Sequence, residues 1–512
     1  MEANNILIVV TVFLPLMGGV LSLFLWGRDR LQRYLGFGIG VLAWLASLGV
    51  MFSALQDGPQ VYRLGGWQPP FGIVLVGDAL STIMVVMSST VLMMGLLYAV
   101  GCHDKVVKHP AFITLFLGME TGLLGALFTG DLFTMFVFME LMVLSSVALV
   151  AISDNKLGLE AAIKYLFISS MGTLFLLLGT AAVYATFGTL NFADIGYQLA
   201  SGDRSILARE AAIMLTAAFL LKSAVFPFHF WQPDFHTTAP TPVHAVLSSV
   251  VVKIGIYGLI RMTTLLFTSE GELAAIRNVL LVLGTISIFF GSLGAFRTYD
   301  GKRLLAYSTF GQIGFILLGI GWGTPLSIAA SIVYAFNHSF IKSALLMLFG
   351  VVSSRTQEKT ARLTEVVGVG KSLPGFVGLL YLLGGMALAG IPPLNGFISK
   401  LALAQSGIDA QQWVTLGLAI GAGILTIMYM MRTWQLVFQQ KPNAQTAALK
   451  SYNDSPLAPA LLITACVVLG LYAGPLADLA AGAANQILNA PIYIEAVLGG
   501  SPIAVVGEVI AI

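Results

Sequence analysis

Apolar stretches of about 20 residues recur along the whole chain, separated by short polar or Gly/Pro-rich segments. A helix of that length crosses the hydrocarbon core of a bilayer, so the pattern predicts an all-α polytopic membrane protein. Fourteen transmembrane spans are expected, at residues 4–26, 32–55, 78–101, 111–129, 131–152, 160–187, 207–229, 241–266, 273–297, 302–322, 325–353, 372–405, 411–437 and 455–480. Residues 56–77, rich in Gly and Pro, predict an extended hairpin between the second and third spans.

The composition supports this class. Of 512 residues, 57% are hydrophobic and only 10% are charged, against about 25% charged in soluble proteins. A soluble enzyme, a nucleic-acid binder and a disordered scaffold are therefore disfavoured, and the net charge of +2 indicates no acidic or basic partner. Cys102 and Cys466 have no paired spacing, and the few histidines form no cluster, so neither a metal site nor a cofactor is predicted.

Lysine and arginine are distributed unevenly between the two ends of the predicted spans. Sixteen lie on one side: Arg28, Arg30, Arg33, Lys105, Lys108, Lys156, Arg297, Lys302, Arg303, Arg355, Lys359, Arg362, Lys371, Arg432, Lys441 and Lys450. Four lie on the other side: Arg63, Arg204, Arg209 and Arg277. Because basic loops stay in the cytoplasm, the first side is expected there, in a plasma or inner membrane. An even number of spans then places both termini outside.

The remaining six basic residues lie inside apolar segments: Lys164, Lys222, Lys253, Arg261, Lys342 and Lys400. A charge at the centre of a transmembrane helix costs about 2.5–3.5 kcal/mol, and such residues usually face a bundle interior and mark ion pathways. Lys222, Lys253, Lys400 and the acid Glu140 are too central to reach the membrane surface, which favours a functional role. Lys164 and Arg261 could equally reach the interface with their long side chains.

These buried charges suggest a proton relay. Burial and neighbouring like charge both disfavour the charged form of a lysine, so a group of central lysines can exchange protons. We hypothesise that Glu140 and Lys222 form a control pair and that Lys253, His338 and Lys400 continue the relay through water. Auxiliary candidates are Lys342, four residues from His338 on the same helix face, and His244, Glu120 and Lys164. His244 could instead hydrogen-bond a neighbour, and Glu120 could simply pair with one.

Proline breaks two of the spans. Pro227 interrupts the seventh, and Pro392 and Pro393 interrupt the twelfth. Such a break is tolerated in lipid only where protein or a water cavity meets the freed carbonyl. Two broken spans in matching positions favour a transporter with two inverted five-helix repeats, spans four to eight and nine to thirteen. The expected divisions are 1–110 (three spans and the hairpin), 111–266 (first repeat), 273–437 (second repeat) and 438–512 (last span and tail).

Several segments resemble a known family. They are TGDLFTMFVFMELMVLSS, GLEAAIKYLFISSMGT, LKSAVFPFHFWQPDFHTTAPTPVHAVLSSVVVKIGIY, DGKRLLAYSTFGQIGF, FNHSFIKSALLML and LAGIPPLNGFISK. They are similar to the antiporter-like, proton-translocating subunits shared by respiratory complex I and Mrp-type sodium/proton antiporters. GGWQPPFGIVLVGDALS and PIYIEAVL look more like the D-type subunits of the Mrp antiporters. The resemblance implies fourteen helices with inverted repeats, and a complex of about seven different subunits.

The resemblance also assigns residues. It implies that Glu140 is the family's span-five glutamate, Lys222 its span-seven lysine and Lys253 its span-eight lysine. His338 matches the span-eleven histidine, and Lys400 the terminal span-twelve position, where lysine fits the D type. Residues 499–512 extend past the usual end of the family, and no role is predicted for them.

The implied function is that of a secondary-transporter subunit rather than an enzyme. It would exchange cytoplasmic sodium for outside protons. Sodium prefers oxygen ligands, whereas the central positions are mostly lysine and histidine, so this chain is expected to carry protons while sodium passes elsewhere. The alternative is the proton-pumping membrane subunit of a complex I-type NADH:quinone oxidoreductase or a related membrane hydrogenase. A structural scaffold leaves the central charges unexplained.

Overall fold

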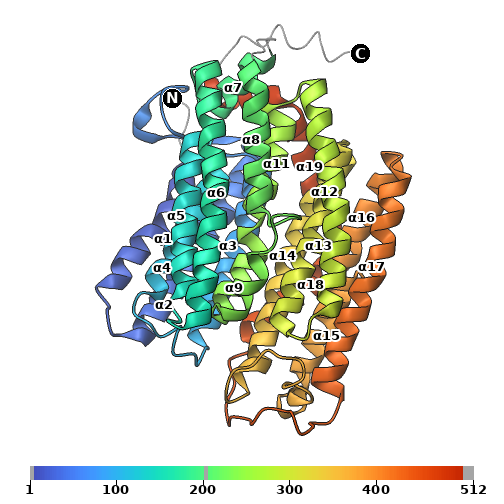
Figure 1. Ribbon diagram of the computed structural model, residues 1–512. Helices are drawn as coiled ribbons and strands as arrows, with labels where there is room; N and C mark the ends of the chain where they lie inside the picture. The colour runs from blue at the N-terminus through green and yellow to red at the C-terminus, as the bar shows by residue number, and fades with distance from the viewer. Residues whose placement is uncertain (1–4, 201–205, 500–512) are drawn as a thin grey trace.

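The computed structural model describes residues 5–200 and 206–499, and it shows a bundle of long helices (Figure 1). The first half contains α1 (Ile6–Leu23), α2 (Asp29–Asp57), α3 (Ala79–Val100), α4 (Phe112–Phe128), α5 (Leu132–Ala151), α6 (Lys156–Phe187) and α8 (Ile206–Lys222). A continuous run follows, formed by α10 (Thr241–Val246), η2 (Leu247–Val251), α11 (Lys253–Arg261) and η3 (Met262–Leu266). The second half contains α12 (Glu270–Arg297), α13 (Gly301–Trp322), α14 (Pro325–Ser354), α15 (Gly375–Ala389), α16 (Asn395–Asp409), α17 (Trp413–Trp434), η5 (Gln435–Gln439), α18 (Leu457–Leu471) and α19 (Gly474–Leu488).

One end of the bundle carries a small β-hairpin, and we call it the hairpin end. Strands β1 (Gln60–Arg63) and β2 (Val74–Gly77) pair antiparallel, which confirms the extended hairpin expected at 56–77. The Asn5 side chain donates to Gln60 Oε1 (3.1 Å), and Arg63 Nη2 donates to Val497 O (3.4 Å) in α20 (Ala490–Leu498). The first and last described segments therefore meet at this end, together with α7 (Phe192–Ala200), which packs on α20.

Three loops meet at the opposite end, which we call the basic end. They are residues 101–111, 355–374, which include the short 3-10 helix η4 (Val369–Ser372), and 440–456. Lys359 Nζ pairs with Asp104 Oδ1 at 2.8 Å, and Ser455 N donates to Gly101 O at 3.1 Å. Eight of the sixteen basic residues that the sequence assigns to one side lie in these loops. Of the four assigned to the other side, Arg204 lies outside the described residues.

The spans confirm an all-α polytopic membrane protein, with differences from the expected fourteen. Ten described helices are long and apolar enough to cross a membrane, and α18 with α19 makes an eleventh, bent by 80°. The span expected at 455–480 is therefore sharply bent, which the sequence did not predict. The chain turns before Gly474 and Pro475, at the start of α19, where proline lacks the N–H that would continue α18.

The other differences lie at shorter or broken helices. Helix α4 has 17 residues, and the seventh and twelfth spans are divided. The seventh consists of α8 and α9 (Gln232–Thr238), and Pro227 lies in the gap between them. The twelfth consists of α15 and α16, with Pro392 and Pro393 in the gap. Both predicted breaks are confirmed.

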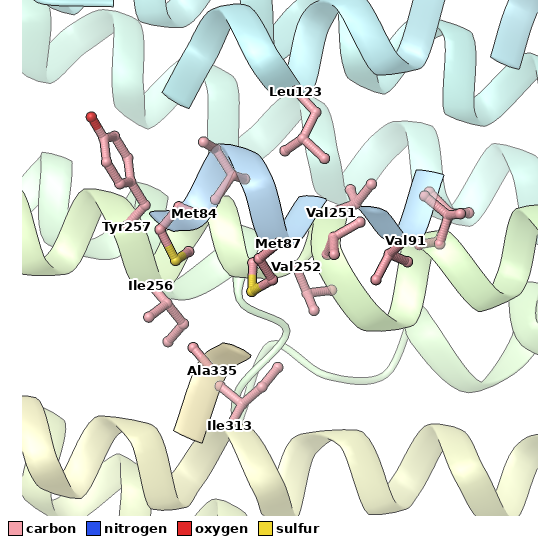
Figure 2. Packing of buried hydrophobic residues seen from close by; sticks show 14 of the residues in the cluster. Met84, Met87, Val91, Leu123, Val251, Val252, Ile256, Tyr257, Ile313 and Ala335 are labelled. Carbon is pink, nitrogen blue, oxygen red and sulfur yellow. The ribbon is translucent and has the colours of Figure 1, made fainter. Parts of the chain in front are cut away.

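The buried centre of the bundle joins α3 to the helices of both halves. The run from Thr241 to Leu266 is buried along its whole apolar window, and α13 and α14 are almost as enclosed. Figure 2 shows Met87 of α3, Leu123 of α4, Val252 and, from the second half, Ile313 and Ala335 converging on this region. Polar side chains on these helices are therefore held away from lipid.

Two helical hairpins in the bundle have matching sequences. Residues 122–131 read GLLGALFTGD before α5, and residues 291–300 read GSLGAFRTYD before α13. Asp131 caps α5 by accepting from Thr134 N (2.8 Å), and Asp300 caps α13 by accepting from Arg303 N (2.9 Å). Gly130 N donates to Val74 O at the hairpin end, whereas Gly301 N donates to Ala361 O at the basic end. The two turns therefore lie at opposite ends of the bundle.

Glycine allows these helices to approach closely. A Cβ on Gly122 would lie 2.6 Å from Phe138 O, and a Cβ on Gly291 would lie 2.7 Å from Tyr307 O. Neither backbone oxygen can move away without separating the helices. Both hairpins therefore depend on glycine at this position.

We expect Gly122→Val to destabilise the bundle by about 1–3 kcal/mol, because the larger side chain forces α4 and α5 apart. The thermal unfolding midpoint in detergent should fall accordingly. Gly417→Val in α17 is a matched control, since a Cβ there has no neighbour within 4 Å. Equal midpoints for the two variants would contradict this account of the packing.

Candidate functional site

Lys222 is the last residue of α8, at the point where the seventh span breaks. It is 6% exposed, and its Nζ donates to Ser169 Oγ (2.8 Å) and Ser169 O (3.1 Å) on α6. Ala224, two residues on, has φ +52, so the helix cannot continue past it. An ammonium at a helix C-terminus is favoured by the partial negative charge of the terminal carbonyls. The break thus provides a polar position for a lysine in the middle of the bundle.

Glu140 on α5 is the charged group that acts on Lys222. No direct ion pair joins the two within the described residues, and Glu140 Oε1 is buried there with no hydrogen-bond partner. Buried carboxylate oxygens are normally hydrogen-bonded, so a water molecule between the pair fits this geometry. The structure therefore places the predicted control pair within electrostatic range but not in contact.

Lys253 follows the π-helical turn η2. Its Nζ donates to the backbone carbonyl of Ser249, in that turn, and Ser339 Oγ of α14 donates to the same oxygen at 3.0 Å. A π-turn shifts the backbone hydrogen-bonding register and is frequent at functional sites. It here presents one carbonyl to both a lysine and a helix of the other half.

His338 and Lys342 lie one turn apart on α14 and face the same region. Lys342 Nζ donates to Ser308 Oγ (2.8 Å) and Leu305 O (3.1 Å) on α13. The charges that act on His338 are those of Lys253 and Lys342. Both ring nitrogens of His338 are buried without a hydrogen-bond partner in the part of the chain that the structure describes. Three basic groups from the eighth and eleventh spans are therefore brought together without a carboxylate.

A small cavity continues from His338 toward α16. Its volume is about 10 Å³, which suits about one water molecule. Gln312, Tyr334, His338 and Ser399 contribute polar groups to its wall, and Tyr334 Oη donates to Gln312 Oε1 at 2.6 Å. One water here would have enough polar partners, and it would connect α14 with the helix that carries Lys400.

Lys400 lies beside the other helix break, in α16. Its Nζ donates to Ala389 O (2.7 Å), the carbonyl at the C-terminus of α15, where the twelfth span breaks. Gly390 follows with φ +82, as Ala224 follows Lys222 with φ +52. The Lys400 amine also lies 5.7 Å from the centre of the Phe315 ring. Each helix break thus has a lysine whose amine donates to a backbone carbonyl.

Two histidines link the seventh span to this cluster. The rings of His236 in α9 and His244 in α10 are 5.9 Å apart, and both residues are fully buried. The lysines that act on His236 are Lys342 and Lys302. The sequence predicts His244 as an auxiliary residue, whereas it gives His236 no role beyond a place near a span end. One sequence signal could have indicated that the two histidines lie close together. They flank Pro240 and Pro242, and two prolines so near each other make a tight connection between helices.

A polar cavity of about 340 Å³ lies at the basic end. Asp104, Asp454, Lys302 and Lys359 are among its lining residues, as is Thr241, which begins the helix of His244. Lys302 is 8% exposed, although the sequence placed it only at the basic end of the span predicted at 302–322. The loops that cover it come from distant parts of the chain, so its own neighbours gave no sign of burial. The cavity provides a polar approach from the basic end toward His244.

The structure does not bring every candidate together with these residues. Lys164 forms surface ion pairs with Glu160 (2.7 Å) and Asp234 (2.9 Å). Glu120 is fully buried on α4, and neither carboxylate oxygen has a hydrogen-bond partner among the described residues. The sequence allowed Arg261 to reach the membrane interface, but in the structure its side chain is buried in a bidentate ion pair with Asp78. Within 5–200 and 206–499, no group of three or more His, Cys, Asp or Glu could hold a metal ion.

Comparison with known proteins defines the class. The family described as NADH:quinone oxidoreductase/Mrp antiporter, transmembrane, matches residues 129–426, which include both broken spans and all the buried lysines. The chain therefore belongs to this family of membrane-embedded subunits. More narrowly, it is a homologue of the D-type subunits of Na⁺/H⁺ antiporters. It is 32% identical to the subunit of that type from Alkalihalophilus pseudofirmus, over 96% of this chain and 99% of the relative.

Two further similarities bear on function. The N-type subunit of the NADH-quinone oxidoreductase of Desulforudis audaxviator is 32% identical over 83% of this chain and 86% of that protein. Among solved structures, a chain of the Mrp complex from Dietzia sp. aligns with a TM-score of 0.89 and 25% identity, over 98% of this chain and 100% of that chain. The relatives thus include both antiporter and redox-complex subunits.

Proposed function

We propose that the chain is the proton-translocating subunit of a multisubunit sodium/proton antiporter of the Mrp type. The observation that carries the proposal is the line of ionisable residues through the bundle: Glu140, Lys222, Lys253, His338 and Lys400, with Lys342, His236 and His244 beside them. Ionisable groups inside a membrane protein are costly and generally serve ion pathways. The similarity to a D-type antiporter subunit over almost the whole chain supports the same function.

At the basic end, protons would pass between the line and the solution. The polar cavity there leads to Lys302 and to the helix of His244, and His236 stands between these groups and Lys342. Because Lys253, His338 and Lys342 lie close together, a proton added to one disfavours charge on the others. Such repulsion moves the charge along the line, through the small cavity between His338 and the helix of Lys400. Glu140 favours the charged form of Lys222 and thereby controls when it releases its proton.

Sodium is proposed to cross the membrane elsewhere in the complex. Hard cations prefer oxygen ligands, and within the described residues the cluster formed by Lys253, His338 and Lys342 includes no carboxylate. Positive charge on these residues would also repel a sodium ion. We therefore assign this chain the proton pathway and cation movement to partner subunits.

We further propose the membrane arrangement. Helices α4 to α11 and α12 to α17 would be two inverted repeats, and α4 and the two broken spans would complete fourteen crossings. The opposite positions of the two matching hairpin turns support this arrangement. The basic end would face the cytoplasm and both termini the outside, because basic loops are retained inside.

The surroundings of Lys400 support the proposal that this chain is part of a larger complex. An apolar cavity of about 340 Å³ beside its amine is lined by Ile420 and Ile424, which are 61% and 60% exposed. A lysine amine that opens toward lipid is unfavourable. A partner subunit that covers this face would remove the cost, which fits a complex of about seven different subunits.

A second function has its own support. The 32% identity to the N-type subunit of an NADH-quinone oxidoreductase favours a proton-pumping membrane subunit of a redox complex. Proton movement along the same residues would then be driven by electron transfer in other subunits. The two functions therefore differ in the energy source for proton movement.

Everted membrane vesicles that contain the complete complex distinguish them. A proton gradient is generated by ATP hydrolysis with respiration inhibited, and sodium is then added. For an antiporter we expect sodium to collapse the pH gradient despite the inhibitor, and vesicles without this chain to show no response. A redox-driven complex would give no sodium response and would instead pump protons only when respiratory substrate is supplied without the inhibitor.

A further inference from the structure

A second polar cavity at the basic end has no part in the proton line. Its volume is about 760 Å³, and it lies between the loop that joins α1 to α2 and the loop that joins α3 to α4. The residues that line it are Gly27, Asp29, Arg30, Arg33, Val100, Gly101, Cys102, His103, Lys108 and Pro110. Three of these side chains are permanently basic, and one is acidic.

Arg33 lines this cavity, and its side chain is held in place by several contacts. It is 7% exposed, and its Nη1 donates to the carbonyls of Ala99 (3.1 Å), Val100 (3.0 Å) and Cys102 (3.3 Å) at the end of α3. Its Nη2 pairs with Asp29 Oδ2 at 3.1 Å. These contacts hold the start of α2 against the end of α3, and they also use the single carboxylate among the lining residues. The acidic group is therefore not free to neutralise other cations.

Arg30 and Lys108 are the two remaining basic groups. Both are exposed, they come from opposite sides of the cavity, and neither side chain forms an ion pair or hydrogen bond within the described residues. The first turn of α2 adds to this charge, because its N-terminus has no side-chain cap and its N–H groups carry partial positive charge. The cavity thus has two free cations and is suited to an anion.

The surroundings indicate where that anion comes from. Phe24, Trp26 and Tyr34 next to the cavity are 82%, 60% and 62% exposed. Exposed aromatic side chains at the end of a transmembrane helix typically mark the boundary between headgroups and acyl chains. Helices α1 and α2 also lie at the outer edge of the bundle (Figure 1), so lipid can reach this site from the side.

We propose that this cavity binds the headgroup of an anionic phospholipid. Arg30 and Lys108 would hold the phosphate from two sides by charge-assisted hydrogen bonds, and the acyl chains would follow the apolar surface of α1 and α2. Basic pockets between transmembrane helices are suited to such headgroups. A free phosphate ion has the same charge chemistry but no acyl chains, so it would bind more weakly. The bound lipid would fasten the first two helices to the end of α3.

The test uses the intact complex in lipid nanodiscs made of phosphatidylcholine with a minor fraction of phosphatidylglycerol. Retained phosphatidylglycerol is counted by native mass spectrometry after mild delipidation. The double variant Arg30→Gln/Lys108→Gln is expected to bind one phosphatidylglycerol about thirtyfold more weakly, since each basic residue contributes roughly fivefold near an anionic surface. Lys371→Gln/Lys441→Gln removes the same charge at the same end, outside the cavity, and should retain the lipid.

Three results would overturn the proposal. They are equal retention in the two double variants, displacement of the lipid by excess inorganic phosphate, and absence of tightly held phosphatidylglycerol from the unaltered complex. The second result would indicate a simple anion site. The third would indicate that a partner subunit covers the cavity. None of these measurements depends on transport, so the proposed function is tested separately.

Discussion

Replacing Lys222 with methionine is expected to abolish sodium-dependent proton movement in vesicles while the complex still assembles. Methionine matches the length of the lysine stem, and Ser169 is the only residue to which the Lys222 amine donates among those described. Because no proton can then be held at the broken end of α8, transport should fall by about a hundredfold or more. The rate of gradient collapse after sodium addition, normalised to complex content, measures the effect.

Two further variants show what kind of group Lys222 is. Lys222→Arg keeps a positive charge that is never released, since arginine is always protonated in proteins. We expect it to assemble and to be as inactive as Lys222→Met. Lys164→Met removes a lysine whose partners are the surface acids Glu160 and Asp234, and it should stay active. An active Lys222→Arg variant would mean that Lys222 acts only as a fixed charge.

Removing Arg261 is expected to have the largest effect on stability. Its guanidinium forms two bonds to Asp78, at 2.6 and 2.7 Å, and lies 5.2 Å from the centre of the Tyr493 ring. Asp78 also caps α3 by accepting from Ser81 N. The ion pair therefore joins α3, α11 and α20 at the hairpin end. Arg261→Gln leaves a buried carboxylate unpaired, which costs about 3–5 kcal/mol.

The amount of assembled complex in membranes and its unfolding midpoint measure this loss. The double variant Asp78→Asn/Arg261→Gln has no unpaired charge, and its two amides can still hydrogen-bond. It should recover much of the stability that either single variant loses, because the cost comes from the uncompensated charge. Additive losses in the double variant would show that the two residues act independently.

The sequence predicted features that depend on local properties. Hydropathy located most spans because crossing a membrane requires a continuous apolar stretch. Pro227, Pro392 and Pro393 located both breaks, since a proline lacks an N–H wherever it occurs. The position at which α9 or α16 resumes could not be read in the same way, because packing against other helices decides it. The bend before Gly474 was missed although Pro475 marked it.

Features that depend on distant contacts were harder to predict. The spacing of His338 and Lys342 placed them on one face, but only the fold brings Lys253 beside them. Lys302 was predicted only as the end of a span, and its burial was not foreseen because the segments that cover it come from distant loops. The Asp78–Arg261 pair joins residues 183 positions apart, so its partner could not be inferred from either neighbourhood. For Arg261, the sequence indicated a buried charge without indicating what neutralises it.

The depth of the line in the bundle has an electrical consequence. Glu140, Lys253 and His338 each lie near the middle of a long helical run, so the line passes across the bundle rather than along it. The membrane potential contributes about 2.3 kcal/mol per charge per 100 mV only when charge moves through the thickness of the membrane. A proton that moves sideways at constant depth therefore gains almost nothing from the voltage. Voltage should act on the steps that fill and empty the line, at the polar cavity near His244 and at the opposite end of the line.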